Sequence, residues 1–198
     1  EANKTIIKKI NNTSSDKIAG FIGDLTNMET SYIVKEFFNK TIKSKYLESR
    51  IDNSYVNIND KKNYIFNSTI NGIEESDLVV LIGTNPRYEA TILNSRIRKS
   101  YLKNKLDVYS IGDVGNLTYP YKVLPNETKT IKDLTEGNHE LCSKIQNSKK
   151  PLIIIGKAAL NLKSGKYIFE EIKKYLFSIK KITDEWNSLN ILSKDAST

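Results

Sequence analysis

One run of apolar residues constrains the fold of this chain more than any other feature. Residues 78–82 read Leu-Val-Val-Leu-Ile and are followed by Gly83. An unbroken apolar run of this length is typical of a strand buried on both faces, as in a parallel sheet covered by helices. The same pattern returns at residues 152–155, which Gly156 follows. The sequence therefore predicts a second buried parallel strand there.

The residues after the first run predict a βαβ unit. Pro86 suits the first turn of a helix, where its missing N–H leaves no hydrogen bond unmade. From Arg87 onward the apolar residues follow helical spacing and share one face: Ala90, Leu93, Ile97 and Tyr101. Arg87, Glu89, Asn94 and Arg98 lie on the opposite, polar face. Residues 106–112 then supply the next strand, and we expect a right-handed crossover.

The loop after the first strand is the candidate functional site. It contains Gly83, Thr84, Asn85, Pro86 and Arg87. Ligands of open α/β sheets bind outside the carboxyl ends of strands, where a helix N-terminus offers unpaired N–H groups to an anion. Arg87 could add a bidentate phosphate contact. In the alternative interpretation Gly83 permits the turn, Asn85 caps the helix and Arg87 is a solvated charge. The residues alone favour this alternative, because every α/β protein needs such turns.

The periodicity of the remaining chain predicts further helices and strands. A helix over residues 1–10 would bury Ile6, Ile7 and Ile10, and a strand follows at residues 18–23. A helix over residues 28–42 would turn five side chains to the core: Ile33, Val34, Phe37, Phe38 and Ile42. Residues 64–67 suit a short strand.

The C-terminal third has weaker signals. Residues 131–147 read as a helix that Gly137 interrupts, and Ser164 is in place to cap the helix after it. Residues 186–192 suit a last helix, packed on the domain or reaching toward a neighbour. We therefore expect a single α/β domain over residues 1–183, with residues 184–198 as an extension or the start of a following segment.

Composition excludes several classes of function. The net charge is +8, but the lysines are scattered rather than clustered with aromatic residues, so a solvated surface is a better interpretation than a nucleic-acid interface. No stretch approaches the roughly 18 apolar residues of a membrane span. Cys142 is the sole cysteine, so the chain cannot ligate an iron–sulfur cluster by itself. His139 lies three residues before it, and two such residues do not make a zinc site. Neither a P-loop nor a dinucleotide-binding motif is present. We therefore expect no catalytic or metal-binding residues.

Several stretches together carry a resemblance to a known family. They are IAGFIGDLTNMETSYIVKEFF (residues 18–38), IDN (51–53), YIFNSTINGIEESDLVVLIGTNPRYEATILNSRIRKSYL (64–102), the LTY of NLTYPY (116–121), KKPLIIIG (149–156) and WNSLNIL (186–192). The chain resembles the C-terminal, molybdopterin-oxidoreductase-like region of the largest peripheral-arm iron–sulfur subunit of respiratory complex I, which is of the G type. Ser54 departs from the pattern, since the family commonly has a basic residue there.

The resemblance implies a fold and a function. The expected fold is a Rossmann-like parallel sheet flanked by helices, of the formate dehydrogenase/DMSO reductase-like superfamily. The expected role is structural: this region would support the cluster-bearing part of the subunit in the matrix arm of NADH:ubiquinone oxidoreductase and would hold no cofactor of its own. Gly83, Asn85, Pro86 and Arg87 would then be a vestigial pterin loop.

The same resemblance implies partners and a location. The partners would be other peripheral-arm subunits, including the cluster-bearing N-terminal part of the same subunit if it is separately encoded. The location would be the matrix side of the mitochondrial inner membrane, or the cytoplasmic side of the bacterial inner membrane. The alternative is a fragment of a pterin-binding molybdenum or tungsten oxidoreductase such as formate dehydrogenase, whose pterin dinucleotide the loop would contact. A basic nucleic-acid-binding domain is a third, weaker option, suggested by net charge alone.

Overall fold

The computed structural model describes residues 1–23, 26–49, 54–104 and 106–193, and the chain divides into two compact units. Glu1–Asn53 belong to the first, here called the N-terminal unit, and Ser54–Lys194 form the second, here called the sheet unit. The sequence predicts one domain over residues 1–183, whereas this division falls after residue 53. Residues 51–53, which carry part of the resemblance, lie outside the described residues.

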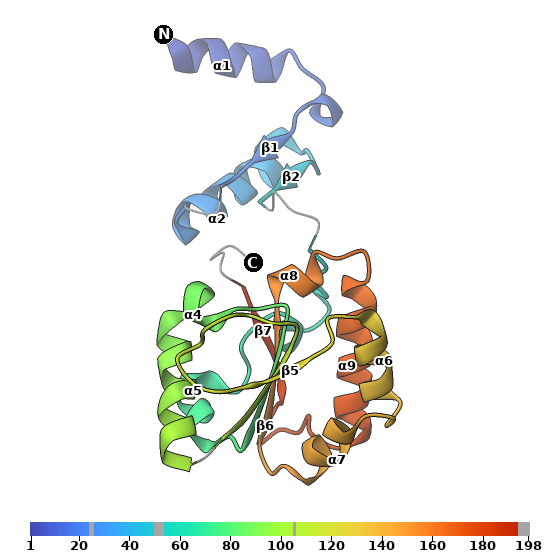
Figure 1. The fold of residues 1–198 in the computed structure, drawn as a ribbon. Coiled ribbons are helices and arrows are strands. Elements are labelled where there is room, and N and C mark those ends of the chain that lie inside the picture. The colour runs from blue at the N-terminus through green and yellow to red at the C-terminus, as the bar shows by residue number, and fades with distance from the viewer. Residues whose placement is uncertain (24–25, 50–53, 105, 194–198) are drawn as a thin grey trace. The chain divides into compact units, whose positions relative to one another are not determined.

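The sheet unit is built on a five-stranded sheet in which every neighbouring pair is parallel (Figure 1). The strands in spatial order are β5 (Lys122–Leu124), β4 (Asp107–Ile111), β3 (Leu78–Ile82), β6 (Pro151–Gly156) and β7 (Leu189–Leu192). Every residue of β3 and of β6 is buried, so both predicted buried strands are confirmed. The chain order reverses between β3 and β6, and this is the point where open α/β sheets bind ligands.

Helices cover both faces of this sheet (Figure 1). On one face lie α3 (Thr69–Gly72), the 3₁₀ turn η4 (Ile73–Glu75), α4 (Pro86–Glu89) and α5 (Thr91–Asn104). On the other face lie α6 (Thr128–Thr135), α7 (Glu140–Asn147) and α9 (Gly165–Ser178), with α8 (Lys157–Leu160) directly after β6. Successive side chains of β3 enter opposite cores: Val79 and Leu81 pack with Ile97 of α5, whereas Val80 and Ile82 pack with Ile172 of α9. The predicted α/β class, a parallel sheet flanked by helices, is confirmed.

The helix predicted from residue 87 is divided in two. Ala90 has φ −152° and ψ 74°, which ends α4, and α5 begins at Thr91. Asn94, expected on the polar face, is 5% exposed. Its amide donates to the carbonyl oxygen of Leu117 at 3.0 Å, and its Oδ1 accepts from the Tyr119 hydroxyl at 2.8 Å. The loop after β4 therefore covers a surface that periodicity assigned to solvent.

The helix predicted over residues 186–192 is wrong, because residues 189–192 form the strand β7. This strand pairs with β6 from Ile153↔Leu189 to Gly156↔Leu192, and so belongs to the sheet although it lies within the range assigned to an extension. Asn190 is fully buried, and its side chain bonds the backbone N–H of Ser68 at 2.8 Å and the Ser68 hydroxyl at 3.1 Å. The short strand expected at residues 64–67 is reduced to one antiparallel bridge, between Phe66 and Asn190. Pairing with β6 and with Ser68 overrides the local preference.

Other boundaries follow the sequence more closely. Gly137, with φ +83°, separates α6 from α7 as predicted. Ser164 occupies the N-cap position of α9, but its side chain makes no capping hydrogen bond. A 3₁₀ turn, η3 (Lys61–Asn63), completes the unit. Among the described residues, no helix is both long enough and apolar enough to span a bilayer.

The N-terminal unit contains a βαβ element. Its elements are α1 (Ala2–Asn11), the 3₁₀ turn η1 (Ser15–Lys17), β1 (Gly20–Phe21), α2 (Met28–Glu36), the π-helical turn η2 (Phe37–Ile42) and β2 (Leu47–Glu48). Strands β1 and β2 are parallel and form a sheet of two strands. The predicted burial of Ile6 and Ile7 is wrong, since no residue of α1 is buried. Of the five side chains expected in the core from residues 28–42, two are buried, Phe38 and Ile42.

Candidate functional site

The predicted loop lies at the carboxyl end of β3, where two backbones approach closely. Gly83 has φ +59°, and a Cβ atom on it would lie 2.4 Å from the backbone N of Ala159. A Cβ atom on Gly156 would lie 2.4 Å from the carbonyl oxygen of Gly83 and 2.4 Å from the Thr84 Cβ. Gly83 therefore permits the turn, as predicted. Both glycines also allow the segments after β3 and β6 to close on each other at the switch point.

Asn85 caps α4 and also fixes the neighbouring loop. Its Oδ1 accepts from the backbone N–H of Arg87 at 3.1 Å, which confirms the predicted cap. Its Nδ2 donates to the carbonyl oxygen of Val114 at 2.7 Å. Both ends of the amide are therefore engaged within the chain.

The carboxylate of Glu89 turns back to the start of α4. Its Oε1 accepts from the backbone N–H of Asn85 at 2.7 Å, and its Oε2 accepts from the Thr84 hydroxyl at 3.0 Å. A carboxylate near a helix N-terminus is stabilised by the partial positive charge of the unpaired N–H groups. Sequence analysis placed Glu89 on the solvated face and missed this role. An acidic residue four positions after Asn85 was the available signal, since a capping box uses similar spacing.

Arg87 is held on the protein surface. Its Nη1 donates to the carbonyl oxygen of Asn116 at 2.7 Å, and its guanidinium carbon lies 6.0 Å from the centre of the Tyr88 ring. The four candidates Gly83, Asn85, Pro86 and Arg87 therefore lie together. The side chains of Asn85 and Arg87 bond to the segment after β4 rather than pointing into a shared space.

The segment after β4 covers this site through its own bonds. The Asp113 carboxylate accepts from the Tyr121 hydroxyl at 2.7 Å and from the backbone N–H of Gly115 at 2.8 Å. These bonds lower the pKa of the Asp113 carboxyl. Burial, together with the bond to Asp113, raises the pKa of Tyr121. Both shifts stabilise the bonded pair in the ionic form that it has at neutral pH.

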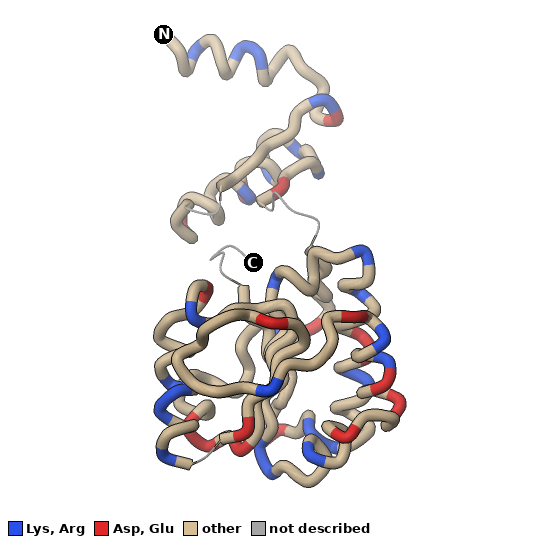
Figure 2. The backbone as a smooth tube through the Cα atoms, in the orientation of Figure 1, with Lys and Arg blue, Asp and Glu red and all other residues tan. Residues whose placement is uncertain are grey.

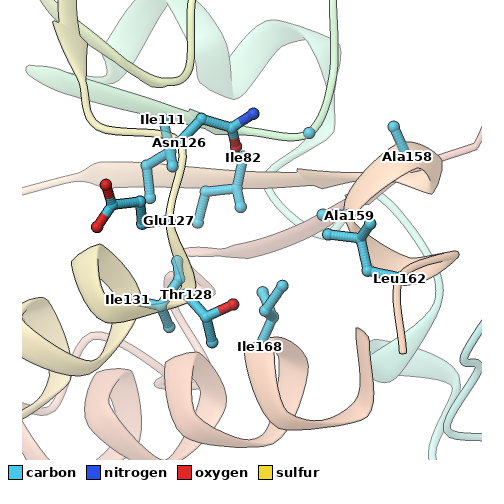
Figure 3. Close-up of a pocket in the computed structure, with 11 residues that line it drawn as sticks. Ile82, Ile111, Asn126, Glu127, Thr128, Ile131, Ala158, Ala159, Leu162 and Ile168 are labelled. Carbon is cyan, nitrogen blue, oxygen red and sulfur yellow. The ribbon is translucent and has the colours of Figure 1, made fainter. Parts of the chain in front are cut away.

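A cavity of about 270 Å³ lies on the other side of the same sheet edge. Figure 3 shows Ile82 and Ile111 from the strands, Ile131 from α6 and Ile168 from α9 around it. Its polar neighbours are the consecutive residues Asn126, Glu127 and Thr128, and all three are exposed. Sequence analysis missed this cavity, because its apolar lining comes from separate segments and each residue alone reads as part of a core.

Metal-binding clusters are absent from the part of the chain that the structure describes. No group of three His, Cys, Asp or Glu side chains there is placed to hold a metal ion. Cys142 is buried, and its sulfur lies 3.1 Å from the carbonyl oxygen of Leu134. The Nδ1 of His139 accepts from the backbone N–H of Leu141 at 3.0 Å and so caps α7. Both residues are engaged in helix packing and capping.

The charged residues do not form a block of one sign in the sheet unit. Figure 2 shows Lys and Arg interspersed with Asp and Glu along its helices and loops. Glu74 accepts from Lys99, with 2.8 Å between Oε2 and Nζ, and also bonds Arg96. These interactions account for two of the basic residues of α5, which therefore do not form a free basic stripe.

Comparison with known proteins identifies the fold. The family model described as molybdopterin oxidoreductase matches residues 1–198. The chain belongs to the molybdopterin oxidoreductase family. Within it, the chain is 43% identical to the NADH-ubiquinone oxidoreductase 75 kDa subunit of Reclinomonas americana, over 93% of this chain and 28% of that protein. It is 35% identical to the G subunits of NADH-quinone oxidoreductase from Rickettsia prowazekii and Rickettsia typhi, over all of this chain and 29% of each relative. The chain thus spans less than a third of the length of these relatives.

The family name implies a pterin cofactor, and the loop after β3 does not fit its phosphates. The N–H of Asn85 bonds the Glu89 carboxylate and the N–H of Arg87 bonds the Asn85 side chain. A phosphate at this position would have to displace both acceptors and would face the charge of Glu89. Repulsion between like charges opposes such binding.

Proposed function

We propose that this chain is a structural segment of the peripheral arm of NADH:ubiquinone oxidoreductase, with no cofactor of its own. It would be part of the enzyme without being catalytic itself. The observation that carries the proposal is the bond from the Asn85 N–H to Glu89, because an internal carboxylate takes the place that an anionic ligand would need. The names of the relatives, each a subunit of NADH-ubiquinone or NADH-quinone oxidoreductase, support the assignment to this enzyme.

The partners follow from the same proposal. They are other subunits of the peripheral arm, including the cluster-bearing N-terminal part of the same subunit if that part is separately encoded. Neither nucleic acid nor a direct membrane span enters the proposal. The location is the matrix side of the mitochondrial inner membrane, with the cytoplasmic side of a bacterial inner membrane as the alternative.

A native gel of detergent-solubilised membranes tests this proposal. The chain is located by mass spectrometry, the bands are stained for NADH dehydrogenase activity, and molybdenum and tungsten are measured in each band. We expect the chain in a large NADH-active band beside cluster-bearing subunits, without stoichiometric molybdenum or tungsten. A small soluble species that carries either metal would overturn the proposal and support the pterin-binding oxidoreductase instead.

The substitution Asn85→Ala separates structure from electron transfer. It removes the cap of α4 and the bond to Val114, and we expect a loss of roughly 1 kcal/mol in the free energy of unfolding. Assembly and NADH-driven electron transfer should persist. Normal assembly with lost electron transfer in this variant would contradict a purely structural role.

A further inference from the structure

The two-stranded sheet of the N-terminal unit has an open edge. Strand β1 bonds β2 through the N–H groups of Gly20 and Ile22, at 2.9 Å to Tyr46 O and 3.1 Å to Glu48 O. Successive residues of a strand direct their backbone groups to opposite sides, so the N–H and C=O of Phe21 point away from β2. Among the described residues, no third strand pairs with β1 or β2. Parallel strands occur almost only in larger sheets that are covered on both faces.

One face of this small sheet is covered by α2 and η2. A Cβ atom on Gly20 would lie 2.5 Å from the ring of Phe38, so this ring packs directly on β1. Phe38 is 8% exposed and Ile42 is 7% exposed. Neighbouring residues of a strand point to opposite faces, so the side chain of Phe21 lies on the other face, and it is 77% exposed.

Helix α2 also presents apolar side chains away from that contact. Met28 is 84% exposed, Tyr32 63% and Ile33 65%. On a helix, residues 28 and 32 fall on a different side from residue 33, so apolar groups occupy more than one flank. Helices with apolar residues around most of their circumference are enclosed by other elements. The N-terminal unit therefore buries too little apolar surface for a sheet of two strands to be stable by itself.

We propose that β1 is extended by a parallel strand from another polypeptide segment, which also covers the ring of Phe21. The segment belongs to the same subunit and corresponds to the part of the curated relatives that this chain does not span. That part is large, since the chain covers 28% to 29% of each relative. Parallel strands are joined by long crossovers, usually helical, within one polypeptide. A segment of the same subunit is therefore a better occupant than a separate subunit.

Site-specific photocrosslinking of the full chain in its own cells tests the surface. The substitution Phe21→p-benzoylphenylalanine places the reactive group on the open face, and Phe177→p-benzoylphenylalanine is the control, because Phe177 is 72% exposed at the end of α9. We expect position 21 to crosslink to a peptide whose sequence aligns with the uncovered part of the relatives, and position 177 not to do so. Crosslinks from position 21 to residues 54–193 of this chain, to a second copy, to an unrelated protein or to nothing would each overturn the inference.

A second pair of variants measures the contact without a reactive group. Phe21→Asp and Phe177→Asp both place a charge at an exposed position, so the melting temperature of the isolated chain should change little in either case. We expect Phe21→Asp to reduce co-purification with the crosslinked segment by at least about tenfold, as for a central interface residue, and Phe177→Asp to leave it unchanged. Equal recovery with both variants would overturn the inference. These assays do not depend on NADH activity, so failure of the proposed function would leave their outcome distinct.

Discussion

The carboxylate of Glu89 accepts a hydrogen bond from the backbone N–H of Asn85, with 2.7 Å between Oε1 and N. The same carboxylate accepts from the Thr84 hydroxyl, and Thr84 is 3% exposed. The start of α4 is thus neutralised from within the chain, and this bond both orders the loop after β3 and opposes an anionic ligand there.

Replacement of Glu89 should destabilise the chain. Glu89→Ala leaves the N–H of Asn85 and the hydroxyl of Thr84 without their acceptor, and we expect the free energy of unfolding to fall by about 1–2 kcal/mol. Urea denaturation followed by circular dichroism measures this change. The control is Glu140→Ala, since Glu140 is in the first turn of α7 and is exposed. An equal loss in both variants would show that the helix charge matters and the bonds do not.

Steric closure at the switch point should be sensitive to one methyl group. In Gly156→Ala the new Cβ would meet the Gly83 carbonyl oxygen and the Thr84 Cβ at 2.4 Å, and overpacking of this kind costs about 3 kcal/mol. Gly137→Ala is the control: its φ is +83°, but no atom lies within 4 Å of the added Cβ. It should cost about 1 kcal/mol from backbone strain alone. The prediction fails if thermal unfolding shows Gly156→Ala to be the milder change.

Asp77 should make stability depend on pH. Burial acts to raise the pKa of its carboxyl, but bonds from the Ser148 hydroxyl and from the N–H groups of Lys149 and Lys150 outweigh burial and lower it. Because the pKa is lower in the folded chain than in the unfolded chain, the stabilisation is present in full above the unfolded value of about 3.9. It is lost as the pH falls through the folded value.

The measurement compares the original chain with Asp77→Asn. We expect the difference between their free energies of unfolding to be largest near neutral pH and to shrink below about pH 4. Asp184→Asn is the control, because Asp184 is fully exposed and its ion pair with Lys62 spans 3.8 Å. A difference that stays constant with pH would refute the assignment to Asp77.

A charge in the centre of the sheet should prevent folding. Leu81 is fully buried in β3, so Leu81→Asp places a carboxylate without a partner in the core and should cost more than about 4 kcal/mol. Leu102→Asp makes the same chemical change where the side chain is 68% exposed, and it should change stability by less than about 0.5 kcal/mol. Soluble yield and the assembled fraction on native gels report the outcome. Normal assembly of Leu81→Asp would contradict the observed burial.

The elements that sequence predicted well are those with one dominant local cause. Unbroken apolar runs identified β3 and β6, because burial on both faces leaves no alternation. Strand β7 escaped prediction, since a segment of four residues containing Asn190 becomes a strand only when β6 and Ser68 satisfy its polar groups. Side-chain exposure in the N-terminal unit was also predicted poorly, because helical spacing shows which residues are apolar but not whether another element covers them.

The candidate site divides in the same way. The roles of Gly83 and Asn85 depend on their own backbone and the next turn, and both were predictable. The bonds from Asn85 to Val114 and from Arg87 to Asn116 join segments far apart in sequence, and no local pattern signals them. The cavity beneath the edge depends on the packing of several segments, which periodicity cannot specify.

The order of the strands has a consequence for how the chain folds. Every pair in the main sheet is parallel, so none forms as a hairpin, and β3 pairs with Asp107 on one side and with Pro151 on the other. During synthesis β3 and β4 emerge well before β6, and the edge of β3 stays exposed until that strand arrives. Contacts between residues distant in sequence slow folding, and exposed apolar edges promote aggregation. We expect the nascent chain to need protection by chaperones over this interval.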